Sequence, residues 1–153
     1  MSIVALAGGV GGAKLVYGLD KTLVPGELSV VVNTGDDFYH YGLKICPDID
    51  TVCYTLAGIA NPVTGWGIDQ DKWNALEMVS KLGGETWFKL GDKDLGLHLE
   101  RTRRFLSGES LTQITHDICE KLNIRTDIYP MTDDDAPTYI DTYSHGRLPF
   151  QEY

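Results

Sequence analysis

Four glycines occur within residues 8–12, directly after an apolar run at residues 3–7 and before a helical pattern that starts near Ala13. Glycine lets the backbone turn sharply and brings amide N–H groups close to an anion, and the helix that follows directs the positive end of its dipole to the same point. The spacing predicts a strand, a phosphate-binding turn and a helix. A tight turn that serves only packing is the alternative.

Neither standard nucleotide-binding motif fits this turn. The dinucleotide fingerprint G-x-G-x-x-G, started at Gly9, requires Gly or Ala where this chain has Lys14. A Walker P-loop requires Ser or Thr after its lysine, and Leu15 stands there. The next predicted strand, at residues 28–32, is followed by Asn33 and not by the carboxylate that usually binds a ribose diol. These departures argue against a nicotinamide-dependent oxidoreductase.

The composition limits the class of protein. The chain has 153 residues, 42% of them hydrophobic, and a net charge of -9. The hydrophobic content predicts a folded domain, and the acidic charge argues against a nucleic-acid partner, because phosphate backbones are bound by clustered Lys and Arg. No apolar run approaches the length of about 20 residues that spans a bilayer, and no secretory leader is evident. Three cysteines without metal-ligand spacing favour reduced thiols and a cytoplasmic protein.

Strand and helix patterns alternate along the chain. Strands are predicted at residues 3–7, 28–32, 86–90, 127–130, 138–142 and 148–153, and helices at 13–23, 50–57, 69–82, 95–106 and 111–122, the last capped by Ser110. This alternation predicts an α/β, Rossmann-like fold with a mainly parallel sheet and helices on both faces. Residues 1–153 are expected to form a single domain or the N-terminal portion of a longer protein.

The last residues, Leu148 to Tyr153, form an amphipathic segment without a polar tail. The ends of intact domains are more often polar and frayed. The sheet is therefore expected to be incomplete at the C-terminus. An unpaired edge strand would then be covered by the second subunit of a homodimer or by a missing C-terminal portion.

Two polar segments are expected near the glycine turn. Their polar residues are Asn33, Thr34, Asp36 and Asp37, after the strand at 28–32, followed by Asp48 and Asp50. Loops after parallel strands meet at the carboxyl edge of the sheet, so four carboxylates are expected near one phosphate site. Mg²⁺ held by carboxylates and phosphate oxygens relieves their repulsion. The alternative is that these residues form a polar turn and cap a helix.

These segments occur in the same order in a known family. The motifs are GGVGGAKL at 8–15, NTGDD at 33–37, GLKICPDIDTV at 42–52, GWGI at 65–68, LGDKD at 90–94, His98 with Arg101, PMTDD at 130–134 and FQEY at 150–153. Together they resemble the 2-phospho-L-lactate transferase family of deazaflavin coenzyme biosynthesis along nearly the whole chain. Members of that family are much longer than this chain, which agrees with an N-terminal portion.

The resemblance implies a group-transfer reaction. The family moves a phospholactyl or phosphoenolpyruvyl group from a diphosphoguanosine donor to the terminal ribityl hydroxyl of the deazaflavin Fo and releases GMP, in coenzyme F(420) biosynthesis. Attack of a hydroxyl on phosphorus is catalysed by positioning and by neutralisation of phosphate charge, so Mg²⁺ is the expected cofactor. The expected partners are the GDP-type donor and Fo.

Roles for individual residues follow from the motifs. Residues expected to bind the substrate phosphates, the ribityl chain or the flat ring are Gly9, Gly11, Gly12, Lys14, Asn33, Thr34, Trp66, His98 and Arg101. Asp48 and Asp50 are expected to hold Mg²⁺, and Asp50 also to accept the ribityl proton. Asp36 and Asp37 are the alternates as metal ligands. Lys14 and Arg101 could instead lie on solvated helix faces, and Trp66 could fill the core.

A second class of function stays open at this point. A wider superfamily contains non-catalytic regulatory proteins that bind a uridine nucleotide sugar and share a glycine turn and a nearby Asp-Asp pair. Those proteins resemble this chain less beyond Asp37. A Rossmann oxidoreductase is the third class considered, because Lys14 and Asn33 depart from the dinucleotide-binding pattern.

Overall fold

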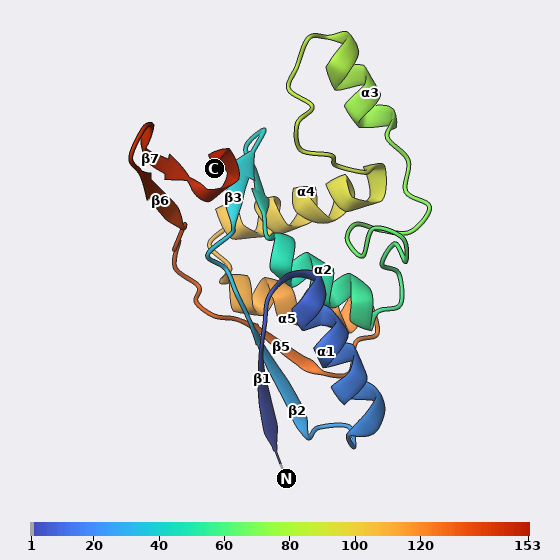
Figure 1. The fold of residues 1–153 in the computed structure, drawn as a ribbon. Helices are drawn as coiled ribbons and strands as arrows, with labels where there is room; N and C mark the ends of the chain where they lie inside the picture. The colour runs from blue at the N-terminus through green and yellow to red at the C-terminus, as the bar shows by residue number, and fades with distance from the viewer. Residues whose placement is uncertain (1) are drawn as a thin grey trace.

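The computed structural model describes residues 2–153 (Figure 1). Three strands, β1 (Ile3–Ala7), β2 (Leu28–Val32) and β5 (Asp127–Pro130), form a parallel sheet in the order β1-β2-β5, with Ile3 opposite Leu28. All three strands have the bounds predicted from their apolar runs. The α/β, Rossmann-like arrangement with a parallel sheet is therefore confirmed.

Helix α1 (Gly9–Thr22) connects β1 to β2. It begins earlier than predicted, at Gly9, because the Gly12 N–H already donates to the Gly8 carbonyl. Its residues Ala13 and Val16 face the sheet and are buried. A Cβ added at Gly12 would lie 3.1 Å from the Cβ of Ala7, so the missing side chain lets the helix approach β1 closely.

One hydrophobic core lies between the sheet and three helices. Helices α2 (Pro47–Leu56) and α5 (Leu111–Lys121) join α1 in this core, together with alternate residues of every strand of the parallel sheet. Val30 and Val32 in the central strand have no exposed surface. The buried alternate residues all belong to one face of the sheet, so within residues 2–153 the helices pack on that face. The second helical layer that a doubly wound sheet requires is not built from these residues.

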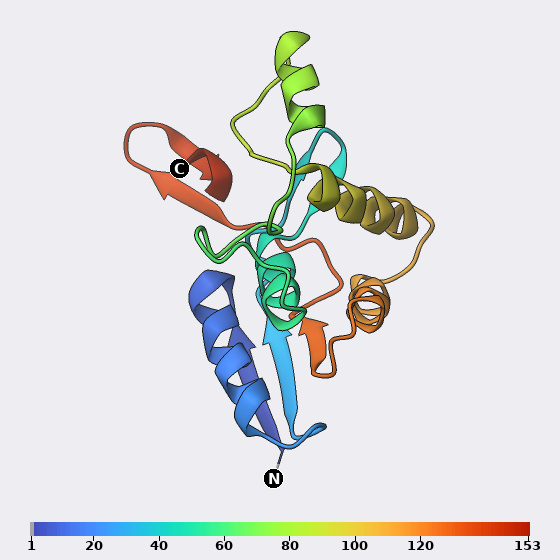
Figure 2. The same cartoon turned by 90° about the vertical axis from the view of Figure 1, so that its right-hand side faces the viewer.

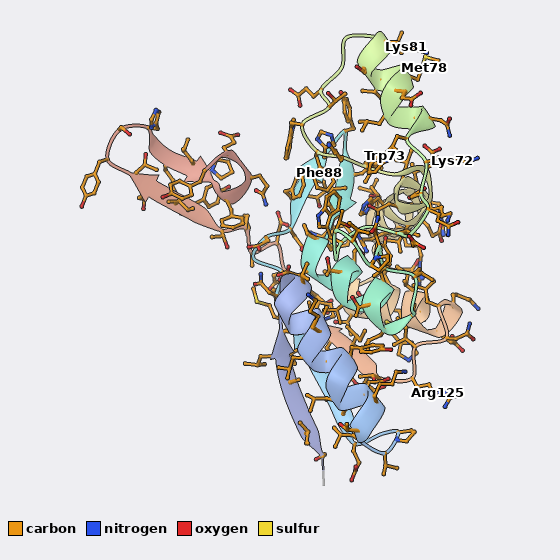
Figure 3. All side chains as sticks on the ribbon, turned by 45° about the vertical axis from the view of Figure 1, so that its right-hand side comes forward. Lys72, Trp73, Met78, Lys81, Phe88 and Arg125 are labelled. Atoms are coloured by element: carbon orange, nitrogen blue, oxygen red, sulfur yellow. The ribbon has the colours of Figure 1, made fainter. Side chains whose placement is uncertain are left out.

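A short antiparallel hairpin of β3 (Phe38–His40) and β4 (Leu43–Ile45) follows β2 and was not predicted. The strand predicted at residues 86–90 is wrong, because this segment has no strand conformation. Trp87 and Phe88 instead pack their rings against the hairpin, with the Phe88 centroid 5.1 Å from that of Phe38. Figure 3 shows Phe88 beside this hairpin. Ring packing produced the apolar pattern that suggested a strand.

Two helices lie between the hairpin and α5. Helix α3 (Asn74–Lys81) is shorter than predicted and has no buried residue. It projects away from the sheet, with Met78 and Lys81 at its far end (Figure 3). Helix α4 (Asp92–Leu106) runs back toward the core and leads to α5, whose predicted cap is confirmed: the Ser110 hydroxyl accepts a hydrogen bond from the Gln113 N–H over 3.1 Å.

A second antiparallel hairpin, β6 (Tyr139–Thr142) and β7 (Gly146–Pro149), ends the chain together with the 3₁₀ turn η1 (Phe150–Glu152). Figure 2 shows this hairpin projecting from the body of the molecule. The strand predicted at 148–153 forms only in part, because the backbone turns into η1 at Phe150. None of the helices in residues 2–153 has the length and apolar character needed to cross a membrane.

The cysteines are free thiols, as predicted. Cys46, Cys53 and Cys119 are all buried, and the Sγ atoms of Cys53 and Cys119 lie 3.7 Å apart between α2 and α5. Burial raises the pKa of the Cys46 thiol well above its usual range, so it stays protonated. These side chains pack in the core as small apolar groups.

Candidate phosphate and metal site

The glycine turn brings several backbone amides to one point. Gly8 has an extended backbone (φ -157°, ψ 139°) and caps α1 without a side chain, and Gly9 follows with φ +57°, in the left-handed region that favours glycine. The Gly12 N–H donates to the Gly8 carbonyl over 3.2 Å, so the amides of residues 9–11 precede the first helical hydrogen bond. These free amides and the helix dipole are suited to an anion.

The predicted phosphate ligands in this turn differ in their surroundings. A Cβ added at Gly11 would meet nothing within 4 Å, so this part of the turn is open. The Gly12 amide is already bonded within the helix, and its missing side chain is explained by packing against Ala7. Lys14 is exposed further along α1. The geometry therefore favours Gly9 and Gly11 over Gly12 as phosphate ligands.

Asp48 lies against the glycine turn. It is in the first turn of α2, it is 8% exposed, and a Cβ added at Gly8 would lie 2.9 Å from its Oδ2 atom. Asn33 Nδ2 donates to the same oxygen over 2.9 Å, while Asn33 Oδ1 accepts from the Gly35 N–H over 3.0 Å. The starts of α1 and α2 therefore meet at one carboxylate, and Asn33 orients it.

A second carboxylate, Asp36, lies near Asp48. Burial raises the pKa of Asp36, and the negative charge of Asp48 raises it further. The backbone carbonyl of Asp36 accepts a hydrogen bond from Gln151 Nε2 over 2.8 Å, which ties this loop to η1. Two neighbouring carboxylates repel each other unless a cation lies between them. Proteins commonly hold Mg²⁺ by one or two carboxylates together with phosphate oxygens, so Asp36 and Asp48 are the residues beside the glycine turn that could hold such a cation.

Two buried side chains next to this pair have polar atoms without a hydrogen-bond partner among residues 2–153. They are the Thr34 hydroxyl and the Asp37 carboxylate, which are 2% and 7% exposed. Burial raises the pKa of Asp37 to about 6, although the Cys46 thiol and the Lys44 ammonium, 3.8 Å away, lower it in part. Buried polar atoms normally have partners, so these two groups are candidates to contact a ligand.

Asp50 has a different partner, on α4. Arg101 Nη1 donates to its Oδ2 over 3.0 Å, and Arg101 Nη2 donates to its Oδ1. Both residues are buried, at 5% and 1% exposure. Residues two apart in a helix lie on nearly opposite sides of it, so Asp48 and Asp50 point in different directions. The structure thus brings Asp48 to the glycine turn and places Asp50 in an ion pair.

The ion pair continues into a network between α2 and α4. Arg101 Nη1 lies 3.1 Å from His98 Nδ1, and because a guanidinium can only donate, Nδ1 accepts and the ring proton is on Nε2. Nε2 lies 3.4 Å from Asp94 Oδ1, which also accepts a 2.5 Å hydrogen bond from the Tyr54 hydroxyl. Burial by itself raises the pKa of Asp94, but the hydrogen bonds from His98 and Tyr54 outweigh it and the pKa is lowered.

This network explains where His98 and Arg101 point. Both were predicted to reach a phosphate, and both are instead buried and bonded within the network. Asp50, Asp94 and His98 offer ligand atoms within 4.8 Å of one another, yet the guanidinium between them opposes a second cation. Tyr54 was missed, whereas Asp94 lies in the LGDKD motif at 90–94, and the i, i+4 spacing of Asp94 and His98 is a sequence signal for contact.

The loop that carries Trp66 packs on the glycine turn. A Cβ added at Gly65 would lie 2.9 Å from Val10 Cγ1, and Gly65 has φ +76°. The Trp66 side chain is 43% exposed, and its carbonyl accepts a hydrogen bond from the Thr64 hydroxyl over 2.7 Å. Trp66 therefore does not fill the core. Its neighbour Gly65 makes the contact with the glycine turn, and a stacking role for Trp66 stays a prediction.

A cavity of about 740 Å³ opens beside Asp37. Its aromatic lining residues are Phe38, Tyr39, His40, Tyr41, Trp87 and Tyr139. Aromatic side chains offer flat faces on which a planar ring can stack. This cavity was not predicted from the sequence, although the four consecutive aromatic residues at 38–41 are a signal for it.

The fold and the site define a class of protein. A glycine turn at the carboxyl end of the first parallel strand, next to acidic side chains, is the ligand-binding edge of a Rossmann-like α/β protein. The profile of one family, 2-phospho-L-lactate transferase CofD, matches residues 3–153. The chain belongs to this family, and the resemblance drawn from its motifs is confirmed.

Curated relatives are similar to the chain over its whole length. Proteins named phosphoenolpyruvate transferase from Kitasatospora aureofaciens, Streptomyces coelicolor and Mycobacterium tuberculosis are 42%, 40% and 39% identical to it. The alignments cover 100% of this chain but 49%, 49% and 52% of those proteins. The chain thus spans about half the length of the curated relatives it matches.

Proposed function

We propose that this chain carries the donor-binding part of a transferase that moves a phospholactyl or phosphoenolpyruvyl group from a diphosphoguanosine donor to the deazaflavin Fo and releases GMP. Family membership over residues 3–153 supports the reaction class. The single observation that carries the proposal is the contact of Asp48 with the glycine turn, beside Asp36. Free amides and paired carboxylates at one point suit a diphosphate bound with a divalent cation.

The donor diphosphate would bind at the start of α1. The amides of Gly9 and Gly11 would donate to its oxygens, and the exposed Lys14 ammonium would add a positive charge. Asp36 and Asp48 would hold Mg²⁺, with Asn33 keeping the Asp48 carboxylate in place. When bound there, Mg²⁺ would neutralise negative charge on the non-bridging phosphate oxygens.

The acceptor would bind in the aromatic cavity. A tricyclic deazaflavin is flat, and Phe38, Trp87 and Tyr139 provide faces for it to stack on. The cavity also reaches Asp37, whose buried carboxylate has no hydrogen-bond partner among residues 2–153. Asp37 would accept the proton of the attacking ribityl hydroxyl. Asp50, the residue predicted for this task from the sequence, is instead bonded to Arg101.

Calorimetric titration of the chain with GDP, with and without Mg²⁺, tests the donor site. We expect binding that requires Mg²⁺, and we expect Asp48→Asn to weaken it by about tenfold or more, since even the partners of metal ligands contribute that much to metal affinity. Asp141→Asn, an exposed carboxylate on β6, is the matched control and should bind as the unchanged chain does. Unchanged GDP affinity in Asp48→Asn would contradict the assignment.

Ligand choice and turnover separate the proposal from its alternatives. A uridine nucleotide sugar or NAD titrated in the same way should bind more weakly than GDP. Release of GMP from the donor should require both Fo and Mg²⁺, because attack by the acceptor hydroxyl and neutralisation of phosphate charge are both needed. Selective binding of the uridine nucleotide sugar, without turnover, would indicate a regulatory protein instead.

A further inference from the structure

The C-terminal hairpin, defined as residues 138–153, forms one wall of the aromatic cavity. Thr138, Pro149 and Gln151 of this hairpin all line the cavity. No residue of 138–153 is buried, and the hairpin projects from the body of the molecule (Figure 2). Segments that bury little surface open locally at a low cost in free energy. The cavity therefore has one wall that can detach while the core stays folded.

The same hairpin is bonded to the loop between β2 and β3, which carries the acidic residues. The Thr138 N–H donates to the Gly35 carbonyl over 2.8 Å, and Gln151 Nε2 donates to the Asp36 carbonyl over 2.8 Å. The approach is close, because a Cβ added at Gly35 would lie 2.8 Å from the Thr138 hydroxyl oxygen. Movement of the hairpin away from the cavity would break both hydrogen bonds and release the backbone of this loop.

The loop reaches the candidate cation site from its other side. The Gly35 N–H donates to Asn33 Oδ1 over 3.0 Å, and Asn33 Nδ2 donates to Asp48 Oδ2 over 2.9 Å. A continuous series of hydrogen bonds thus runs from the cavity wall, through the loop, to the carboxylate at the glycine turn. Such a network carries coupling between two sites when one element has two arrangements. Here the two arrangements are the attached and the detached hairpin.

We propose that a flat aromatic ligand in the aromatic cavity and a divalent cation at Asp36 and Asp48 strengthen each other's binding, with Gln151 as the positioning residue that couples them. The aromatic ligand contacts the hairpin only when the hairpin is attached. The cation requires the backbone of Asp36 to be held, and Gln151 holds it in the attached state. Both ligands therefore favour the same state, and each shifts the equilibrium toward it.

This coupling adds to the proposed function and rests on it for the identity of the two sites. Coupling between two binding sites is reciprocal, so each ligand raises the affinity of the other by the same factor. The cation would be held most tightly when an acceptor is in place to receive the transferred group. Gln151 would contact neither the transferred group nor the cation in this arrangement, and it acts through the Asp36 backbone.

Titrations with two ligands test the coupling in the 153-residue chain. Mn²⁺ replaces Mg²⁺, because carboxylate sites accept both, and its electron paramagnetic resonance signal broadens on binding. Riboflavin, a flat tricyclic molecule with a ribityl chain, is the probe for the aromatic cavity, and fluorescence anisotropy measures its binding. We expect saturating riboflavin to tighten Mn²⁺ binding about fivefold or more, and Mn²⁺ to tighten riboflavin binding by the same factor.

Gln151→Met removes the hydrogen-bond donor and keeps a side chain of similar length. Each ligand should still bind alone, but the ratio of the Mn²⁺ affinities with and without riboflavin should approach one, because the Asp36 backbone is no longer held. A loss of structure would weaken the binding of each ligand instead. Gln113→Met is the matched control, because the Gln113 amide also donates one hydrogen bond of 2.8 Å, to Asp117 on α5. This control should keep the ratio of the unchanged chain.

Hydrogen exchange gives a second readout that does not depend on a variant. The Thr138 amide loses its partner when the hairpin detaches, so riboflavin alone or Mg²⁺ alone should slow its exchange. The Leu82 amide, which bonds to the Met78 carbonyl at the end of α3, should exchange as in the free chain.

The outcomes separate this inference from the proposed function. If Mn²⁺ and riboflavin both bind but neither changes the affinity of the other, the coupling is overturned while both sites stand. A full ratio in Gln151→Met, or coupling without slower exchange at Thr138, would overturn the role of the hairpin and with it the proposal. If either ligand fails to bind at all, its proposed site is wrong and the coupling is overturned together with it.

Discussion

Replacing Arg101 with alanine is expected to destabilise the protein strongly. Arg101 is 1% exposed and its guanidinium makes two hydrogen bonds to Asp50, which is 5% exposed. Removing the cation leaves a buried carboxylate without its partner, which costs about 3–5 kcal/mol. Domains of this size lose about 1–3 kcal/mol of unfolding free energy per molar urea, so the urea midpoint should fall by roughly 2 M. Circular dichroism during urea titration measures this shift.

Two variants control this experiment. Asp50→Leu combined with Arg101→Met removes both charges and should recover most of the lost stability, because a buried ion pair can often be replaced by apolar side chains at little cost. Arg103→Ala breaks the exposed pair with Glu100 on the same helix, and water replaces that contact, so no measurable change is expected. If Arg101→Ala shifts the midpoint no more than Arg103→Ala, the buried ion pair is refuted and Asp50 becomes available as a metal ligand again.

Three further substitutions test other contacts by thermal unfolding. Gly12→Val adds a branched side chain where even an added Cβ would lie only 3.1 Å from Ala7, and should cost about 1–3 kcal/mol through overpacking. Ser110→Ala removes the N-cap of α5 and should cost about 1 kcal/mol. Tyr54→Phe removes a donor from the buried Asp94 carboxylate and should cost about 1–3 kcal/mol. If the melting temperature of any of these variants is unchanged, the contact or close approach on which its prediction rests is contradicted.

The parallel sheet could be predicted because its signal is local. Each of β1, β2 and β5 is a short apolar run bounded by turn residues, and each appears where it was expected. The strand expected at residues 86–90 fails because its apolar side chains pack as rings against Phe38 and His40, far away in the sequence. The pattern of apolar residues within a short stretch of sequence is the same for packed aromatic rings and for a paired strand, so it does not distinguish them.

The site was predictable in part for the same reason. Loops after parallel strands meet at one edge, so the glycine turn, Asn33 and Asp36 could be placed together without coordinates. The position of Asp50 could not be predicted in this way, because it depends on the residue at which α2 begins. The prediction started this helix at Asp50, whereas Pro47 occupies its first turn, so Asp48 and Asp50 are both helical and face opposite sides. The partner of Asp50 is 51 residues away along the chain.

Helix α2 connects the proposed donor site to the interior of the protein. Its first turn presents Asp48 to the glycine turn, while Asp50 and Tyr54 bind α4 through Arg101 and Asp94. Rotation of α2 about its axis would break a buried ion pair and a buried hydrogen bond, so these contacts fix the direction of the Asp48 carboxylate. A carboxylate held in place before the ligand arrives loses little conformational freedom on binding. Asp48 and Asp50, which were predicted to act together, thus have separate roles in this proposal: Asp48 faces the proposed donor site, and Asp50 fixes the orientation of the helix that carries it.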